Sequence, residues 1–244
     1  MRRVATLALF GLGLIVAHNS LAVRRIRRVA DVHDHSLSLN AIVGNGLDTP
    51  LRLVVLGDSY PAGFGLTDPA ETYPHQLARR ISERTGRPVR VVSKAVRGAR
   101  TDDVTRTQVP GLDNLRPDVV AVLVGANDAL ARRTPTRVRR DTTAMLEAIR
   151  AAAPGAQLVI GRAADLGDSP VLPWPLSRLV SLASNWTARV QAEVADEVGV
   201  PHDRAPRQGP EMFGPDGFHG SAISHALAAD MTVAALTLRQ GLSG

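Results

Sequence analysis

The sequence predicts an α/β protein of three layers, in which a parallel β-sheet is covered by helices on both faces. Short continuous runs of Val, Leu and Ile are typical of strands that are buried on both faces. From residue 51 onward these runs alternate with longer segments of helical periodicity, which favours a three-layer α/β/α arrangement. A length of 244 residues suits one such domain and a short N-terminal extension.

Five segments have the composition of buried strands and predict a five-stranded parallel sheet. They are residues 51–56, 89–93, 118–124, 157–161 and 198–202. The segments between and after them predict helices, because their apolar residues recur on one side or because they are small and apolar throughout. These helical segments are residues 72–84, 135–153, 176–198 and 222–238.

Residues 1–28 are expected to be a signal peptide or a membrane anchor. Arg2 and Arg3 precede an apolar run from Val4 to Ala17, and Ser20-Leu21-Ala22 offers small residues for cleavage. An uncleaved anchor through residues 4–23 is the alternative, and an anchor with the domain facing the cytoplasm stays open. Export is therefore expected, with residues 29–50 as a linker and residues 51–240 as the domain.

The formal net charge of +6 does not predict a nucleic-acid-binding protein. Six arginines and no acid lie in residues 1–28, and the rest of the chain has 23 basic and 23 acidic residues. The aromatic content of 3% also argues against binding of single-stranded nucleic acid, whose bases stack on aromatic side chains. The absence of cysteine excludes disulfides and thiol nucleophiles, and no cofactor or metal site is expected.

The strongest candidate for a nucleophile is Ser59, in the tripeptide Gly57-Asp58-Ser59. It directly follows the predicted strand 51–56, and ligands of open α/β sheets bind where the strands end. A second copy, Gly167-Asp168-Ser169, follows no apolar strand and is interpreted as a turn. The segment around Ser59 can also be an ordinary strand-to-loop turn. A catalytic role for Ser59 therefore requires a base and hydrogen-bond donors from elsewhere in the chain.

Two further turns would supply hydrogen-bond donors for a negatively charged oxygen. Asn127, in Gly125-Ala126-Asn127-Asp128, follows the predicted strand 118–124 and so belongs at the same edge as Ser59. Its amide can donate to a developing oxyanion. Gly98 follows the strand 89–93, and a glycine lets its backbone N–H approach a reacting carbonyl. Each turn taken alone also has a purely structural interpretation.

The candidate general base is His219, with Asp216 as the residue that orients it. A carboxylate three residues before a histidine can accept a hydrogen bond from Nδ1–H and leave Nε2 to take a proton from serine. The isolated histidines are expected to be structural. These are His18, His75, His202 and His225.

Together these blocks resemble the SGNH, or GDSL, hydrolase family over about residues 51–240. The resemblance implies a flavodoxin-like sheet with strand order 2-1-3-4-5. It also implies ester hydrolysis through an acyl-enzyme on Ser59, with His219 as base and Asp216 as its partner. The oxyanion donors would be the N–H groups of Ser59 and Gly98 and the side chain of Asn127, with no metal or cofactor.

The chain departs from the family at three positions near the site. Ser93 stands where the family often has Asn, Arg97 where a small residue is usual, and Gly220 where Pro is common. None of these changes removes a group with a proposed catalytic role. Arg97 is a candidate substrate-binding residue, because its charge would favour esters that bear negative charge.

The substrate is expected to be a small-molecule ester or an ester on a lipid or glycan. Residues 165–179, with three prolines and Trp174, could form a wall of the acyl pocket or simply connect strand to helix. Two other functions stay open. One is an acyltransferase or a deacetylase acting on cell-envelope lipid or glycan, and the other is a non-catalytic binding protein on the same scaffold.

Overall fold

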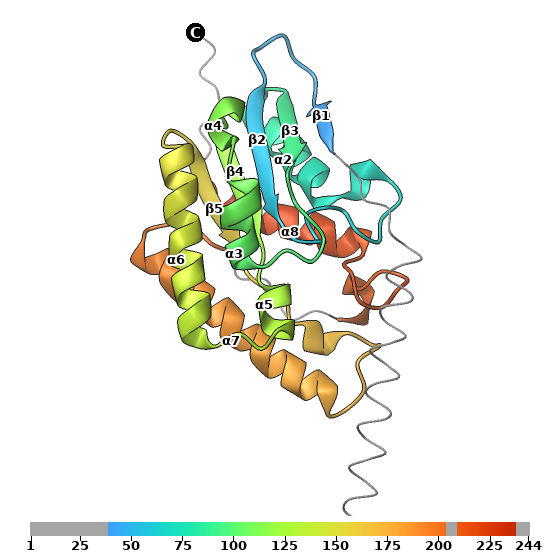
Figure 1. Ribbon diagram of the computed structural model, residues 1–244. Helices are drawn as coiled ribbons and strands as arrows, with labels where there is room; N and C mark the ends of the chain where they lie inside the picture. The colour runs from blue at the N-terminus through green and yellow to red at the C-terminus, as the bar shows by residue number, and fades with distance from the viewer. Residues whose placement is uncertain (1–38, 204–208, 238–244) are drawn as a thin grey trace, which may run out of the picture.

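The computed structural model describes residues 39–203 and 209–237, which form a three-layer α/β/α domain (Figure 1). Its five-stranded sheet has the strand order β1-β3-β2-β4-β5. The strands are β1 (Asn40–Val43), β2 (Leu51–Gly57), β3 (Val89–Ser93), β4 (Val119–Leu123) and β5 (Gln157–Gly161). The predicted α/β class is confirmed.

The parallel core of the sheet is as predicted, but its two edges differ from the prediction. β2 pairs in parallel with β3 and β4, and β4 pairs in parallel with β5. β1 pairs antiparallel to β3, inside the segment 29–50 for which a linker was expected. The four residues of β1 are too few for a hydrophobic pattern, and Val43 is buried only because the rest of the chain covers it.

The prediction of a strand at 198–202 is wrong. This segment makes a single parallel bridge, from His202 to Ile160 of β5. The Ile160 N–H donates to the carbonyl of Pro201 at 3.0 Å, but Pro201 has no N–H of its own to extend the pairing. The sheet is therefore mixed, with four parallel strands and one antiparallel edge strand.

Four long helices cover the sheet near the predicted segments. They are α2 (Tyr73–Thr85), α6 (Pro135–Ala152), α7 (Leu176–Glu197) and α8 (Ala222–Ala235). Shorter elements connect them. These are α3 (Thr101–Asp103), a π-helical turn (Val104–Gln108), α4 (Leu112–Leu115), α5 (Ala126–Leu130) and three 3₁₀ turns (Pro69–Glu71, Leu166–Asp168, Pro210–Met212).

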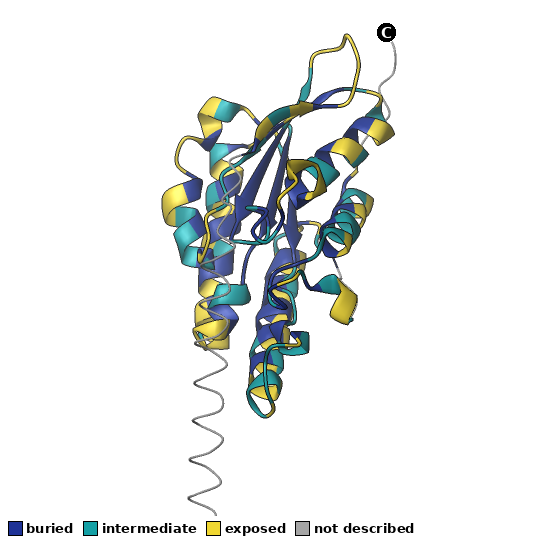
Figure 2. Cartoon of the chain, turned by 90° about the vertical axis from the view of Figure 1, so that its right-hand side faces the viewer, coloured by how far each residue is buried: buried dark blue, intermediate teal, exposed yellow. Residues whose placement is uncertain are grey.

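Two hydrophobic cores lie on opposite faces of the sheet, and side chains alternate between them along each strand. On β2, Leu53 and Val55 belong to the core under α2 and α8, whereas Val54 and Leu56 belong to the core under α6 and α7. Figure 2 shows the buried strands between helices whose outer faces are exposed. Coverage on both faces explains why these strands read as continuous apolar runs.

Within residues 39–203 and 209–237, no helix has the length and apolar character needed to cross a membrane. The predicted signal peptide or anchor, residues 1–28, lies outside the described residues.

The C-terminal end of β2 is pressed against β4. Gly57 has φ +140°, and a Cβ at this position would lie 1.9 Å from the Leu123 carbonyl oxygen, so no larger residue fits. The buried side chain of Gln108 forms two hydrogen bonds of 2.8 Å to Gly57, accepting from its N–H and donating to its C=O. Gln108 therefore holds the strand end from which the Ser59 turn begins.

We expect Gln108→Leu to lower the free energy of unfolding by about 1–3 kcal/mol, because it leaves the buried Gly57 N–H without a partner. Urea denaturation measures this change. Thr107→Ala, at an exposed position of the same turn, serves as the control and should stay within about 0.5 kcal/mol of wild type. Equal stabilities of the two variants would contradict the role assigned to Gln108.

Candidate active site

Ser59 lies in a tight turn directly after β2. The N–H of Asp58 donates to the Leu123 carbonyl at 3.2 Å, which fixes the start of the turn against β4. The Asp58 carboxylate accepts from the Tyr60 N–H at 3.1 Å, and the Phe64 N–H donates to the Ser59 carbonyl at 3.0 Å. Asp58 thus braces the turn, and burial raises the pKa of its carboxyl to about 7.

His219 and Asp216 are held together by a short hydrogen bond. Nδ1 of His219 lies 2.6 Å from Oδ2 of Asp216, and both side chains are buried. The other carboxylate oxygen accepts from the N–H groups of Phe218 and His219, each at 2.9 Å. Burial alone would raise the pKa of Asp216, but the hydrogen bonds from His219 and from these N–H groups lower it to about 2.

Aromatic rings hold the imidazole in place. The ring centroids of Phe64 and His219 are 4.6 Å apart, and Phe218 meets His219 edge-on at 5.4 Å. The guanidinium of Arg97 lies over the Phe64 ring, 4.7 Å from its centroid, in a cation–π contact. Arg97 therefore places positive charge one aromatic ring away from His219.

Ser169, from the second Gly-Asp-Ser tripeptide, supports the loop that carries His219. The local structure there is a 3₁₀ turn, as the sequence indicated. The buried hydroxyl of Ser169 donates to the Gly217 carbonyl at 2.6 Å, and Gly217 lies between Asp216 and His219 in the chain. Sequence reasoning missed this contact, and no local pattern marks it, because the two residues are 48 positions apart.

The loop after β3 and the helix α5 after β4 are tied together by side chains. Nδ2 of Asn127 donates to the Ala99 carbonyl at 3.0 Å, which orients the amide and leaves its second N–H for another acceptor. The carboxylate of Asp128 accepts two further bonds of 3.0 Å, from the N–H and the hydroxyl of Thr101. Asn127 and the loop of Gly98 are thereby held in one arrangement.

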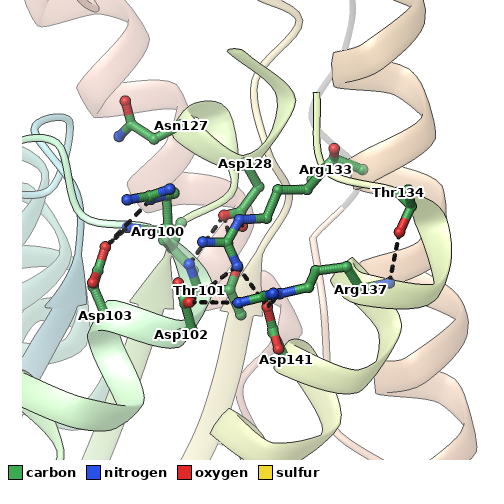
Figure 3. Close-up of polar contacts among 12 residues, drawn as sticks. Arg100, Thr101, Asp102, Asp103, Asn127, Asp128, Arg133, Thr134, Arg137 and Asp141 are labelled. Atoms are coloured by element: carbon green, nitrogen blue, oxygen red, sulfur yellow. Dashed lines mark hydrogen bonds and ion pairs between the residues drawn. The ribbon is translucent and has the colours of Figure 1, made fainter. Parts of the chain in front are cut away.

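A cluster of arginines and carboxylates compensates the buried charge of Asp128 (Figure 3). Nε of Arg133 lies 3.7 Å from Asp128, and Nη1 of Arg133 bonds Asp102 at 3.0 Å and Asp141 at 2.8 Å. Burial is the largest influence on Asp128 and raises its pKa. Arg133 opposes this shift and is a residue that the sequence analysis did not single out.

A small cavity of about 60 Å³ lies between the turn after β2, the helix α5 and the loop of His219. Ser59, Asn127 and His219 line it together with apolar residues, among them Leu166 and Phe218. In the described part of the chain no hydrogen bond joins the Ser59 hydroxyl to His219, and in free enzymes such bonds are often long.

Three of the expected contact residues, Gly98, Arg97 and Trp174, do not line this cavity. Gly98 is exposed, has φ +77° and stands one residue before Ala99, the partner of Asn127. Trp174 is 70% exposed.

His225 lies behind the site and is buried, as expected for a structural histidine. Its ring stacks on Tyr60 with centroids 4.0 Å apart, and its Nδ1 accepts from the Tyr73 N–H at 2.8 Å. Burial is the main reason that its pKa falls to about 3. No group of three or more His, Asp or Glu side chains in residues 39–203 and 209–237 could hold a metal ion.

Comparison with known proteins gives one family. Residues 55–227 match the model of the GDSL-like Lipase/Acylhydrolase family. The chain is 34% identical over 203 residues to the GDSL-like esterase Rv1075c of Mycobacterium tuberculosis. That match covers 76% of this chain and 62% of the relative, so the chain spans about three fifths of the relative's length.

Solved structures share the fold at low identity. A lipase/acylhydrolase from Enterococcus faecalis is 22% identical, with a TM-score of 0.60 over 75% of this chain and 94% of that one. An acetylxylan esterase from Geobacillus stearothermophilus is 14% identical, with a TM-score of 0.60 over 81% of this chain and 97% of that one.

We expect His225 to make the folded state less stable as the pH is lowered, because its imidazole can be protonated only after unfolding. Its pKa is about 3 in the folded chain and near 6.5 when unfolded, so between these values only the unfolded state binds the proton. The contribution of His225 to the free energy of unfolding should therefore drop by about 1.4 kcal/mol for each pH unit below about 6. Asp58, whose pKa is raised to about 7, contributes with the opposite sign in this range, so the effect of His225 is read from the difference between wild type and a His225 variant. Denaturation of wild type and His225→Gln at several pH values from 7 to 4.5 measures the slope of the free energy of unfolding against pH. The two slopes should differ by an amount on the order of one proton.

The matched control is Ile223→Gln, an exposed position on the same helix. It should keep the wild-type slope. A His225→Gln variant with the wild-type slope would mean that His225 takes up its proton in the folded state.

Proposed function

The chain belongs to the GDSL-like lipase/acylhydrolase family, and we propose that it hydrolyses carboxylic esters through an acyl-enzyme on Ser59. The observation that carries this proposal is the position of His219. Its Nδ1 is occupied by Asp216 at 2.6 Å, and the residue lines the same cavity as Ser59 and Asn127. An imidazole oriented in this way has only Nε2 free to accept a proton.

In the proposed first step, the Ser59 oxygen forms a bond to the acyl carbon while its proton moves to Nε2 of His219. The carbonyl π electrons pass to the oxygen, which becomes an oxyanion. The bond to the leaving alcohol then breaks, and the alkoxide takes the proton from His219. Water repeats the sequence and releases the acid and free Ser59.

The charges around His219 suit this transfer. The pKa of Asp216 is about 2, so its carboxylate is ionised at neutral pH and stabilises the imidazolium that forms. For the oxyanion we propose the N–H groups of Ser59 and Gly98 and the second amide N–H of Asn127. The bond from Asn127 to Ala99 keeps that amide oriented before substrate arrives, which is the basis of such stabilisation.

Labelling with a fluorophosphonate probe tests the nucleophile, because the probe reacts with an activated serine hydroxyl. We expect wild type to be labelled and Ser59→Ala to remain unlabelled. Ser169→Ala is a matched control, since Ser169 occupies the other Gly-Asp-Ser tripeptide. Its hydroxyl supports the Gly217 carbonyl, so we expect slower labelling but not its loss.

Equal labelling of wild type and Ser59→Ala would contradict the proposal and favour a binding protein. Labelling of Ser59 together with acyl transfer to an added alcohol, in place of hydrolysis, would make the chain an acyltransferase.

We also propose that Arg97 favours substrates with a negative charge near the ester. Its guanidinium lies over Phe64, which contacts His219, so the charge is close to the reacting groups. Arg97→Ser should lower kcat/KM for an anionic ester by about five- to tenfold, an electrostatic effect of about 1 kcal/mol. A neutral ester of equal size should be much less affected, and equal losses on both would remove the idea.

A further inference from the structure

Both tryptophans of the chain are exposed, one in α7 and the other just before it. Trp174 precedes α7 and Trp186 lies within it, and they are 70% and 54% exposed. Leu179 and Leu182 of α7 are 62% and 60% exposed. We call the surface made by these four side chains the tryptophan surface.

The three helical members share a face of α7. Leu179, Leu182 and Trp186 follow each other at spacings of three and four, which places them in one stripe. The opposite side of α7 is the buried one, where Val180, Ala188 and Ala195 pack against the domain. α7 is thus apolar on both sides over this stretch, and the domain core accounts for only one of them. Contiguous exposed apolar residues of this kind mark interaction sites.

The arginines outnumber the carboxylates around the tryptophan surface, where one carboxylate, Asp165, accepts hydrogen bonds from Ser181 and Asn185 of α7. Arg178 and Arg189 are exposed and bracket the surface, and neither forms an ion pair within the described ranges. No acidic residue occurs between Ser169 and Ala192. The next acid on this helix, Glu193, is engaged by Arg139 at 2.6 Å.

From this combination we propose that the tryptophan surface docks on an anionic phospholipid bilayer. Tryptophan is favoured at membrane interfaces, where its ring is apolar and its N–H stays hydrated. Exposed leucines enter the boundary between headgroups and acyl chains, and neighbouring arginines pair with lipid phosphates. A protein partner would need no excess of one charge, whereas an anionic membrane fits Arg178 and Arg189 directly.

The tryptophan surface borders the candidate active site. The segment that leads to Trp174 is fastened to the His219 loop, because Ser169 donates to the Gly217 carbonyl and Val171 lies against Gly217. Leu166, just before this segment, lines the cavity with Ser59. Docking would therefore bring the cavity close to the acyl esters of a membrane. This last step rests on the function proposed above, but the docking itself does not.

Intrinsic tryptophan fluorescence of the full chain tests the docking selectively, since residues 1–38 contain no tryptophan. The probe is vesicles of phosphatidylglycerol mixed with phosphatidylcholine, with brominated acyl chains as quenchers. We expect a blue shift of the emission and quenching by the bromines. Arg178→Gln and Arg189→Gln should each weaken the interaction about fivefold on these vesicles, the effect of one basic residue at an anionic surface.

The double variant Leu179→Ser and Leu182→Ser should raise the lipid concentration needed for half-maximal quenching by about tenfold or more, since two apolar side chains no longer insert. The matched control removes two exposed apolar residues, Ile42→Ser and Leu47→Ser, near β1 at the other end of the domain (Figure 1). It should behave as wild type.

Three results would overturn the proposal. One is sedimentation of the chain with vesicles without a change in emission, which would place the contact in the N-terminal segment alone. The second is equal quenching with phosphatidylcholine alone. The third is a blue shift that depends on protein concentration without lipid, which would assign the surface to a second copy of the chain.

Hydrolysis of a soluble ester separates this proposal from the one on function. The leucine double variant should cleave such an ester at the wild-type rate. Hydrolysis without a lipid-dependent change in emission would refute docking alone, and docking without hydrolysis would refute the proposed activity alone.

Discussion

The buried carboxylate of Asp128 holds together the segments that carry Gly98 and Asn127, two of the three proposed oxyanion donors. It accepts both hydrogen bonds of Thr101 and lies beside Arg133, so its burial is compensated on one side by donors and on the other by a cation. Removing one partner of such a buried charge is far more harmful than replacing the whole group. The arrangement therefore links the position of Asn127 to the integrity of the Arg133 cluster, at some distance from the cavity.

The histidine side of the site is built independently. Asp216, Phe64 and Ser169 each contact the loop of His219, and they come from three different parts of the chain. Two separately supported halves thus meet at the end of the sheet, with Ser59 between them. This division explains how a cavity of about 60 Å³ can keep its geometry although no hydrogen bond closes it from Ser59 to His219.

α7 connects the site to the outer surface of the molecule. On its inner side Gln191 donates to the Val124 carbonyl at 2.9 Å, directly before the turn that carries Asn127. On its outer side it carries three members of the tryptophan surface. One helix thus supports the turn of a proposed oxyanion donor and presents the surface proposed to meet lipid. The orientation of the domain on a membrane would then be set by the same element.

The sequence by itself determined the α/β class, the four parallel strands and the order in which Ser59, Asn127 and His219 follow the strands and loops. It could do so because strands buried on both faces must be continuous apolar runs, and because parallel strands deliver their following turns to one edge. Only the tertiary structure decided the antiparallel edge strand β1, the failure of 198–202 to form a strand, and the exposure of Trp174. It alone also revealed the contacts of Ser169 and Arg133. These features depend on which distant segments lie side by side, and such pairings leave no period or spacing in the local sequence.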